Sequence, residues 1–111
     1  DEVRPFEKLL VETRGGEAGV ITSVQGGGRV KVALLGAPGS AVDASMSELT
    51  LVRPGKKDQI IVVKGDFAGQ VGTLIGVDGA DGIVKMGDTL DIHILDLSFF
   101  GKLQDAKGVD G

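Results

Sequence analysis

The chain has 111 residues, 41% of them apolar, and a formal net charge of −4 at pH 7. This length suits one ordinary domain or two very small ones, and the apolar content excludes wholesale disorder. The chain has no Cys, which excludes disulfides, thiolate zinc sites and cysteine nucleophiles and fits an intracellular protein. No apolar run reaches the roughly 20 residues of a transmembrane helix.

Charge and residue usage narrow the class of protein further. Residues 1–53 carry 6 basic and 7 acidic side chains, and residues 54–111 carry 6 and 9, so bulk charge argues against strong non-specific binding to nucleic acid. Trp and Tyr are absent, so any core consists mainly of Val, Ile and Leu, which favour strands. The first residue is not Met and no signal peptide follows it, so we expect a fragment of a longer chain.

The first predicted unit covers residues 1–53. Residues 16–32 read GEAGVITSVQGGGRVKV, which is a GxxG segment, a short strand, a glycine-rich turn and a second strand. KLLVETRGG leads into this pattern, and AVDASMSELTLV, residues 41–52, closes it less regularly. A short basic joint, residues 54–57, follows, and its shortness predicts that the units on either side touch.

The second predicted unit covers residues 58–103 and repeats the first. Residues 69–86 read GQVGTLIGVDGADGIVKM, and with one extra residue in the turn, Gly82 aligns with Gly28 and Lys85 with Lys31. The run at 97–103 predicts an extra strand or a packing turn, with Phe99 or Phe100 filling the second unit or the interface. Residues 104–111 have no periodicity and are predicted to be a flexible tail.

Four to five short strands in each unit, with no helical period, predict an all-β fold of two tandem small SH3-like β-barrels. Closing each barrel would also remove exposed strand edges. In DIHIL, His93 alternates with Ile92 and Ile94 and points to the opposite face, and we expect it to be a surface histidine.

Residues 58–86, DQIIVVKGDFAGQVGTLIGVDGADGIVKM, resemble a KOW motif, the SH3-like barrel of NusG-type transcription factors and some ribosomal proteins. The match is closer to the last two KOW units of the large subunit of DSIF, the eukaryotic NusG homologue. Glu48, Leu49, Leu51, Val52 and Pro54 match the joint between those units, and residues 90–103 match the run that ends near FFGKL.

The resemblance implies a non-catalytic, nuclear transcription elongation module without cofactor or metal. It implies docking on RNA polymerase II and elongation-associated proteins, weak contact with nascent RNA, and no membrane partner. A small zinc-containing subunit would bind other parts of the full-length chain. The alternative is a KOW nucleic-acid-binding module of a ribosomal or RNA-processing protein.

The candidate RNA- or partner-binding residues are Arg53, Lys56, Lys57, Lys64, Phe67, Gln70 and Lys85. Phe67 either stacks on a base or caps the end of the barrel, and we favour the cap. Arg53, Lys56 and Lys57, at or beside the joint, either hold a phosphate backbone or an acidic protein surface, or are merely solvated.

The candidate turn residues are Gly69, Gly72, Asp78, Gly79, Asp81 and Gly82. A calcium loop starting at Asp78 would need oxygen ligands where Ala80 and Gly82 stand, so a metal site is excluded there. We expect the two aspartates to stabilise the turn through side-chain hydrogen bonds to the backbone. Ser98, His93 and Asp96 lack the sequence context of a catalytic triad, and no catalytic residue is assigned.

Overall fold

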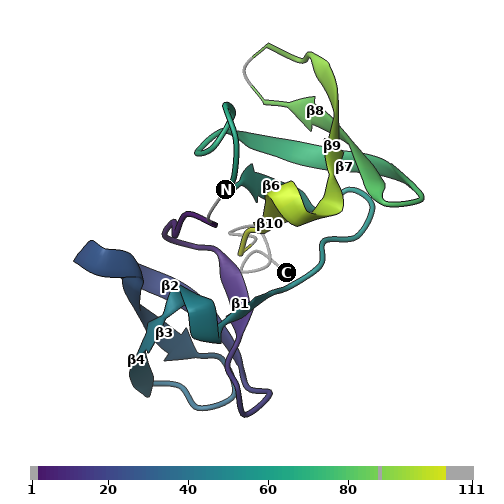
Figure 1. Ribbon diagram of the computed structural model, residues 1–111. Helices are drawn as coiled ribbons and strands as arrows, with labels where there is room; N and C mark the ends of the chain where they lie inside the picture. Colours follow the sequence, from purple (N-terminus) through teal and green to yellow (C-terminus); the bar gives the residue numbers. More distant parts are fainter. Residues whose placement is uncertain (1–2, 88, 105–111) are drawn as a thin grey trace.

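The computed structural model describes residues 3–87 and 89–104, which form two five-stranded antiparallel sheets (Figure 1). The first sheet has the order β4-β3-β2-β1-β5 and the second has the order β10-β6-β7-β8-β9. The strands are β1 (Leu10–Glu12), β2 (Ala18–Val24), β3 (Arg29–Leu34), β4 (Ala41–Ser45), β5 (Thr50–Leu51), β6 (Gln59–Val62), β7 (Val71–Asp78), β8 (Asp81–Met86), β9 (Ile92–Asp96) and β10 (Phe100–Lys102). The predicted all-β class is confirmed.

Three short 3-10 turns connect strands in the described residues, and the second and third of them lie at matching places in the two sheets. They are η1 (Gly26–Gly28), η2 (Met46–Glu48) and η3 (Leu97–Phe99). The run at 97–103, predicted as a strand or a packing turn, is both, because η3 leads directly into β10. No helix among residues 3–87 and 89–104 has the length and apolar composition that crossing a membrane requires.

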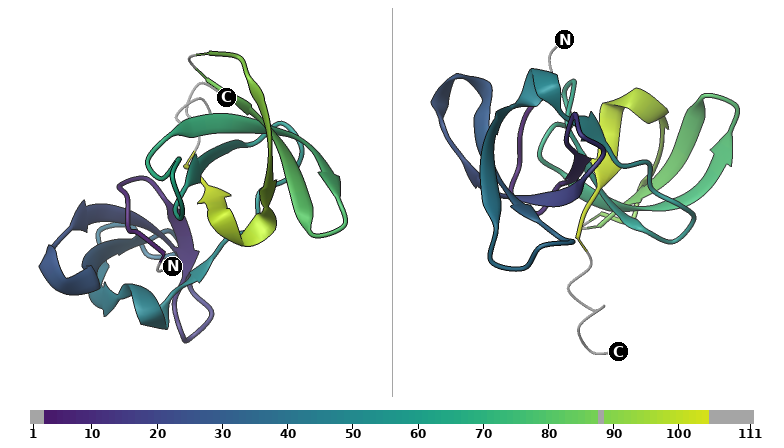
Figure 2. Two further views of the ribbon diagram at one scale, coloured as in Figure 1. Left: turned by 45° about the horizontal axis from the view of Figure 1, so that its top comes forward. Right: turned by 90° about the horizontal axis from the view of Figure 1, so that it is seen from below.

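The internal repeat appears in the structure as two equivalent hairpins. The β2–β3 pair shifts register between Ile21 and Ser23, and the β7–β8 pair shifts between Leu74 and Gly76. A bulge in each long strand increases its twist and bends the sheet around its core. The two glycine-rich sequences therefore build the same bent sheet twice, as Figure 2 shows from two further directions.

Two of the predicted turn glycines lie inside strands instead. A Cβ on Gly72, in β7, would lie 2.7 Å from the carbonyl oxygen of Lys85, and a Cβ on Gly82, in β8, would lie 2.5 Å from Phe100. Both glycines permit close packing across the sheet rather than a turn. Only Gly79, with φ of 63°, stands in the two-residue connection between β7 and β8.

One hydrophobic core is shared by the two sheets. Its buried residues are Leu9, Val11, Ile21, Val30 and Val32 from the first half and Ile61, Val63 and Leu103 from the second. Leu9 and Leu103 form an antiparallel bridge, and the Arg4 N–H donates to the Val63 carbonyl at 2.9 Å. The prediction that the two units touch is confirmed.

A second core lies entirely within the second sheet. It contains Ile60, Val62, Leu74, Val84, Met86 and Phe100. Phe100 is only 1% exposed, so one of the two predicted phenylalanines fills this core. Residues 105–111 of the predicted tail lie outside the described residues, whereas the Gln104 N–H donates to the Lys8 carbonyl at 2.8 Å.

Strand β9 lies at the edge of the second sheet (Figure 1). Among the described residues it pairs with β8 alone, so the ladder does not close from β9 to β10. The expectation that closure removes every strand edge is therefore wrong here, because η3 turns the chain away before β9 and β10 can pair.

Candidate partner-binding site

A groove of about 590 Å³ lies where the two sheets meet. It brings together two of the predicted cations, Arg53 just before the joint and Lys64 from the loop after β6. Its other lining residues are Val3, Leu51, Val52, Pro54, Gly79, Ala80, Asp96, Leu97, Ser98 and Phe100. The groove is thus mostly apolar, with two cations and one carboxylate.

The carboxylate of Asp96 stabilises the start of η3 at one side of this groove. Its Oδ1 accepts the Ser98 N–H at 2.9 Å and the Ser98 hydroxyl at 2.7 Å. These hydrogen bonds hold the pKa of Asp96 below its ordinary value, and the charge of Lys64 lowers that pKa further. The Lys64 Nζ also lies 5.7 Å from the ring centroid of Phe99, so the cation rests over an aromatic face.

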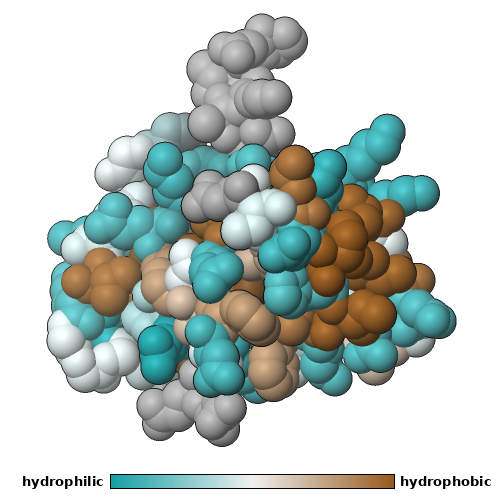
Figure 3. Space-filling model, turned by 90° about the horizontal axis from the view of Figure 1, so that it is seen from above, coloured by the Kyte–Doolittle hydropathy of each residue, from teal (hydrophilic) through white to brown (hydrophobic). Residues whose placement is uncertain are grey.

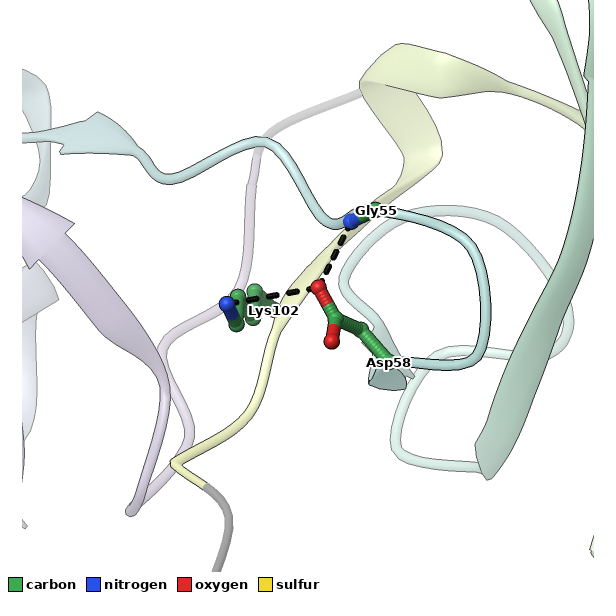
Figure 4. Close-up of polar contacts among 3 residues, drawn as sticks. All are labelled: Gly55, Asp58 and Lys102. Atoms are coloured by element: carbon green, nitrogen blue, oxygen red, sulfur yellow. Dashed lines mark hydrogen bonds and ion pairs between the residues drawn. The ribbon is translucent and has the colours of Figure 1, made fainter. Parts of the chain in front are cut away.

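The joint itself is held by hydrogen bonds. The Gly55 N–H donates to Oδ2 of Asp58 at 2.6 Å, and the Lys102 Nζ lies 3.3 Å from the same oxygen (Figure 4). The Lys57 N–H donates to the Leu74 carbonyl at 2.7 Å, which ties the turn to β7. Lys56 and Lys57 are exposed on this turn and do not line the groove.

Phe67 packs on the barrel rather than projecting from it. Its ring is partly buried against the second core, and its centroid lies 4.7 Å from that of His93 with the planes tilted by 59°. His93 is therefore half-buried on the inner side of β9, which corrects its expected place on the surface. The register explains this: His93 pairs with the fully buried Val84, and paired residues share one face of a sheet.

The remaining candidate residues lie elsewhere on the second sheet. Gln70 is exposed beside Gly69, which has φ of 95°. Lys85 is exposed on the outer face of β8, between Thr73 on β7 and Ile92 on β9. The structure thus does not gather the seven candidates into one surface.

The two turn aspartates do not act as expected. Asp78 and Asp81 pair across the end of the β7–β8 ladder, and Asp81 pairs in turn with Asp96. The Asp78 and Asp81 side chains are both exposed, and neither accepts a hydrogen bond from the backbone of the described residues. Residues 3–87 and 89–104 also contain no cluster of three potential metal ligands.

The residues that the sequence did not single out are the isoleucines of β9. Ile92 is 53% exposed and Ile94 is 67% exposed. Figure 3 shows a continuous apolar area over this part of the second sheet. A comparison of the two copies of the repeat could have identified these isoleucines, because the first copy has Asp43 and Ser45 at the equivalent positions.

Comparisons with known proteins agree with this architecture. Residues 52–103 match the family described as transcription elongation factor SPT5, seventh KOW domain. SPT5 homolog 1 of Arabidopsis thaliana is 44% identical over 87 residues, 78% of this chain and 8% of that protein. SPT5 homolog 2 of the same plant is 38% identical over 107 residues, 92% of this chain and 11% of that protein.

The chain thus spans about a tenth of the length of the curated relatives it matches. The KOW domains of this family are non-catalytic. The strand order, the repeated hairpin and the sequence matches together show that this chain belongs to the SPT5 transcription elongation factor family, with a seventh KOW domain at residues 52–103.

Proposed function

We propose that this chain is a protein-docking module of a nuclear elongation factor. It binds RNA polymerase II or proteins that travel with the polymerase, and nascent RNA is a secondary, weak contact. The small zinc-containing subunit binds other parts of the full-length protein.

The packing of the Phe67 ring is the observation that favours protein over RNA as the main binding partner. Binding of single-stranded RNA by such a barrel would rest on an aromatic face for base stacking and on a basic track for phosphates. The ring of Phe67 packs instead against His93 and the second core. The candidate cations are divided between the groove, the joint turn and the outer face of β8.

The groove supports docking of a protein segment. Its walls are largely apolar and come from both sheets, and the shared core and the hydrogen-bonded joint hold those walls together. Concave, mostly apolar surfaces with a few placed polar groups are typical binding sites. Arg53 and Lys64 supply the polar groups that would orient an acidic or carbonyl-rich partner segment.

Two binding assays test this proposal. We expect the chain to bind a purified RNA polymerase II elongation complex, and Arg53→Glu to weaken that binding, whereas Lys31→Glu on β3 leaves it unchanged. In a gel shift with single-stranded RNA across a salt series, we expect no shift at micromolar protein. Micromolar or tighter RNA affinity that falls steeply with salt would favour the nucleic-acid-binding alternative.

A purely architectural spacer is the other rival. In that case Arg53→Glu, and charge reversal at Lys56 and Lys57, would change neither association with the polymerase nor RNA binding. Loss of polymerase association in Arg53→Glu, with the fold intact by circular dichroism, would exclude a spacer.

A further inference from the structure

Among the described residues, the backbone of β9 has hydrogen-bonding groups without a partner at the edge of the second sheet. The Met86 N–H donates to the Asp91 carbonyl at 2.8 Å, and the Leu97 N–H donates to the Ala80 carbonyl at 2.9 Å. Since hydrogen-bonded residues alternate along an antiparallel pair, the N–H and C=O groups of Ile92 and Ile94 point away from β8. No strand of the described residues pairs with β9 on that side.

The side chains of the same two residues form an exposed apolar surface. Ile94 pairs with Ile83 on β8, which in turn pairs with the bulge region at Ile75 and Gly76 on β7. These isoleucines form a row across the outer face of three strands. Four backbone groups without a partner among the described residues and two exposed isoleucines therefore occupy the same short edge.

The first sheet shows that the fold does not need these isoleucines. On β4, the equivalent edge strand, Asp43 pairs with Lys31 and Ser45 pairs with Arg29. A charge in the middle of an edge strand is a common protection against pairing with another chain. On β9 the corresponding positions are Ile92 and Ile94, so the second copy of the same architecture lacks this protection.

The charges around the isoleucines indicate what kind of chain fits. Asp81 and Asp96 pair with each other two residues beyond the Ile83–Ile94 pair, on the same outer face. Lys85 is the one cation on the outer face of the described β8 and β9 strands, beside Ile92 at the other end. A partner strand with aliphatic side chains on Ile92 and Ile94 would therefore place its next outward residue beside two carboxylates.

We propose that β9 extends its sheet with an extended segment of a partner protein, which runs parallel to β9 and carries two aliphatic residues at alternate positions and Lys or Arg at the next alternate position. The backbone of the segment pairs with Ile92 and Ile94, and its cation contacts Asp81 and Asp96. This inference rests on the proposed docking function and names the surface and the chemistry of the partner. A second copy of this chain fits less well as the partner. Pairing β9 with β9 would place Asp91 and Asp96 of both copies beside one short ladder, and each chain has a net charge of −4, so the two copies would repel each other.

A designed peptide tests the proposal directly. The probe is a capped synthetic peptide with isoleucine at two alternate positions and lysine at the next alternate position, and the comparison peptide has glutamate in place of lysine. We expect the lysine peptide to shift the amide resonances of β9 and to slow hydrogen exchange at the Ile92 and Ile94 N–H groups. We also expect the glutamate peptide to bind about tenfold more weakly or worse, because it meets Asp81 and Asp96.

The variant Ile92→Asp with Ile94→Ser gives β9 the edge residues of β4. Both side chains are more than half exposed, so the fold should survive, and its amide spectrum checks this. We expect the double variant to lose at least about tenfold in affinity for the lysine peptide. The matched control Val24→Asp, which replaces an exposed aliphatic residue of the first sheet, should bind it normally.

The outcomes separate this inference from the proposed function. Three results would overturn this inference. The amides of Ile92 and Ile94 could already be protected from hydrogen exchange in the free chain, the peptide could shift only resonances of the groove, or the two peptides could bind with equal affinity. Dimerisation that the double variant abolishes would assign the edge to a second copy and overturn it as well. If the elongation complex binds the wild-type chain and the double variant equally, docking stands and the role of β9 fails. If only the peptide binds, the edge stands and polymerase docking fails.

Discussion

Asp58 and Lys102 form an ion pair between the residue before β6 and the last residue of β10, with 3.3 Å between Oδ2 and Nζ. The same Oδ2 accepts the N–H of Gly55 at 2.6 Å, so one carboxylate joins the basic joint to the second sheet. The pKa of Asp58 lies below its ordinary value of 3.8, chiefly because of the Gly55 hydrogen bond and secondarily because of Lys102. Solvent reaches both side chains, so the hydrogen bond contributes more than the ion pair.

Asp58→Ala is expected to destabilise the protein by roughly 1 kcal/mol at neutral pH, because the Gly55 N–H loses its acceptor. A carboxylate with a lowered folded pKa stabilises the fold above its unfolded pKa, and this stabilisation is lost as the pH falls through the folded pKa. The difference between wild type and variant should therefore be full above pH 3.8 and shrink below it. Urea unfolding at a series of pH values measures this.

Lys102→Met is the matched variant for the ion pair. We expect a loss of roughly 0.5 kcal/mol or less, falling further in high salt, because the pair is partly exposed. A Lys102→Met effect larger than that of Asp58→Ala would show that the ion pair, and not the Gly55 hydrogen bond, holds the joint.

Gly101→Ala is expected to destabilise the protein by about 1–3 kcal/mol, because the added Cβ would lie 2.7 Å from Cδ1 of Leu9 across the contact between the sheets. Gly36→Ala is its control, since a Cβ there meets no atom within 4 Å. Thermal unfolding of the two variants distinguishes an overpacked interface from a general effect of replacing glycine. Equal melting temperatures would contradict close packing at Gly101.

Leu9→Ala is expected to cost about 2–5 kcal/mol, as for other leucines truncated in a core. Leu9 belongs to the first half but packs in the core that both sheets share. Hydrogen exchange should therefore accelerate in β6 and β10 as well as in β1 and β2. Leu90→Ala, at a 63% exposed side chain, should stay within about 0.5 kcal/mol of wild type.

Phe67→Ala is expected to lower the free energy of unfolding by about 1–3 kcal/mol, because the ring covers the second core and contacts His93. Its affinity for single-stranded RNA should equal that of wild type. Phe67→Leu, which keeps an apolar side chain over the core, should recover much of the stability. A stable Phe67→Ala variant with weaker RNA binding would instead make Phe67 a stacking residue.

Much of the fold could be predicted from local sequence patterns. The turn at Gly79, the strands on either side of it and the matching positions of Lys31 and Lys85 depend on neighbours in the chain, which a repeat makes visible. The roles of Gly72 and Gly82 could not be predicted in this way. Glycine stands at these two positions because atoms of Lys85 and Phe100, which lie on other strands, leave no room for a Cβ.

The candidate site was less predictable than the fold. Basic residues near a joint suggested one contact surface, but the chain directs Arg53 into the groove and leaves Lys56 and Lys57 on an exposed turn. Side-chain direction in such a loop depends on the hydrogen bonds of Asp58 and Lys57 to more distant residues, which composition does not reveal.

The sequence by itself determined the class of fold, the duplication and the family, because hydrophobic alternation and glycine-bounded turns act over short distances along the chain. It also determined that His93 lies opposite Ile92 and Ile94 in β9. Only the tertiary structure decided which of them faces the solvent. The pairing of His93 with buried Val84 turns the histidine inward toward Phe67 and leaves both isoleucines on the open edge, because residues paired across a ladder share one face.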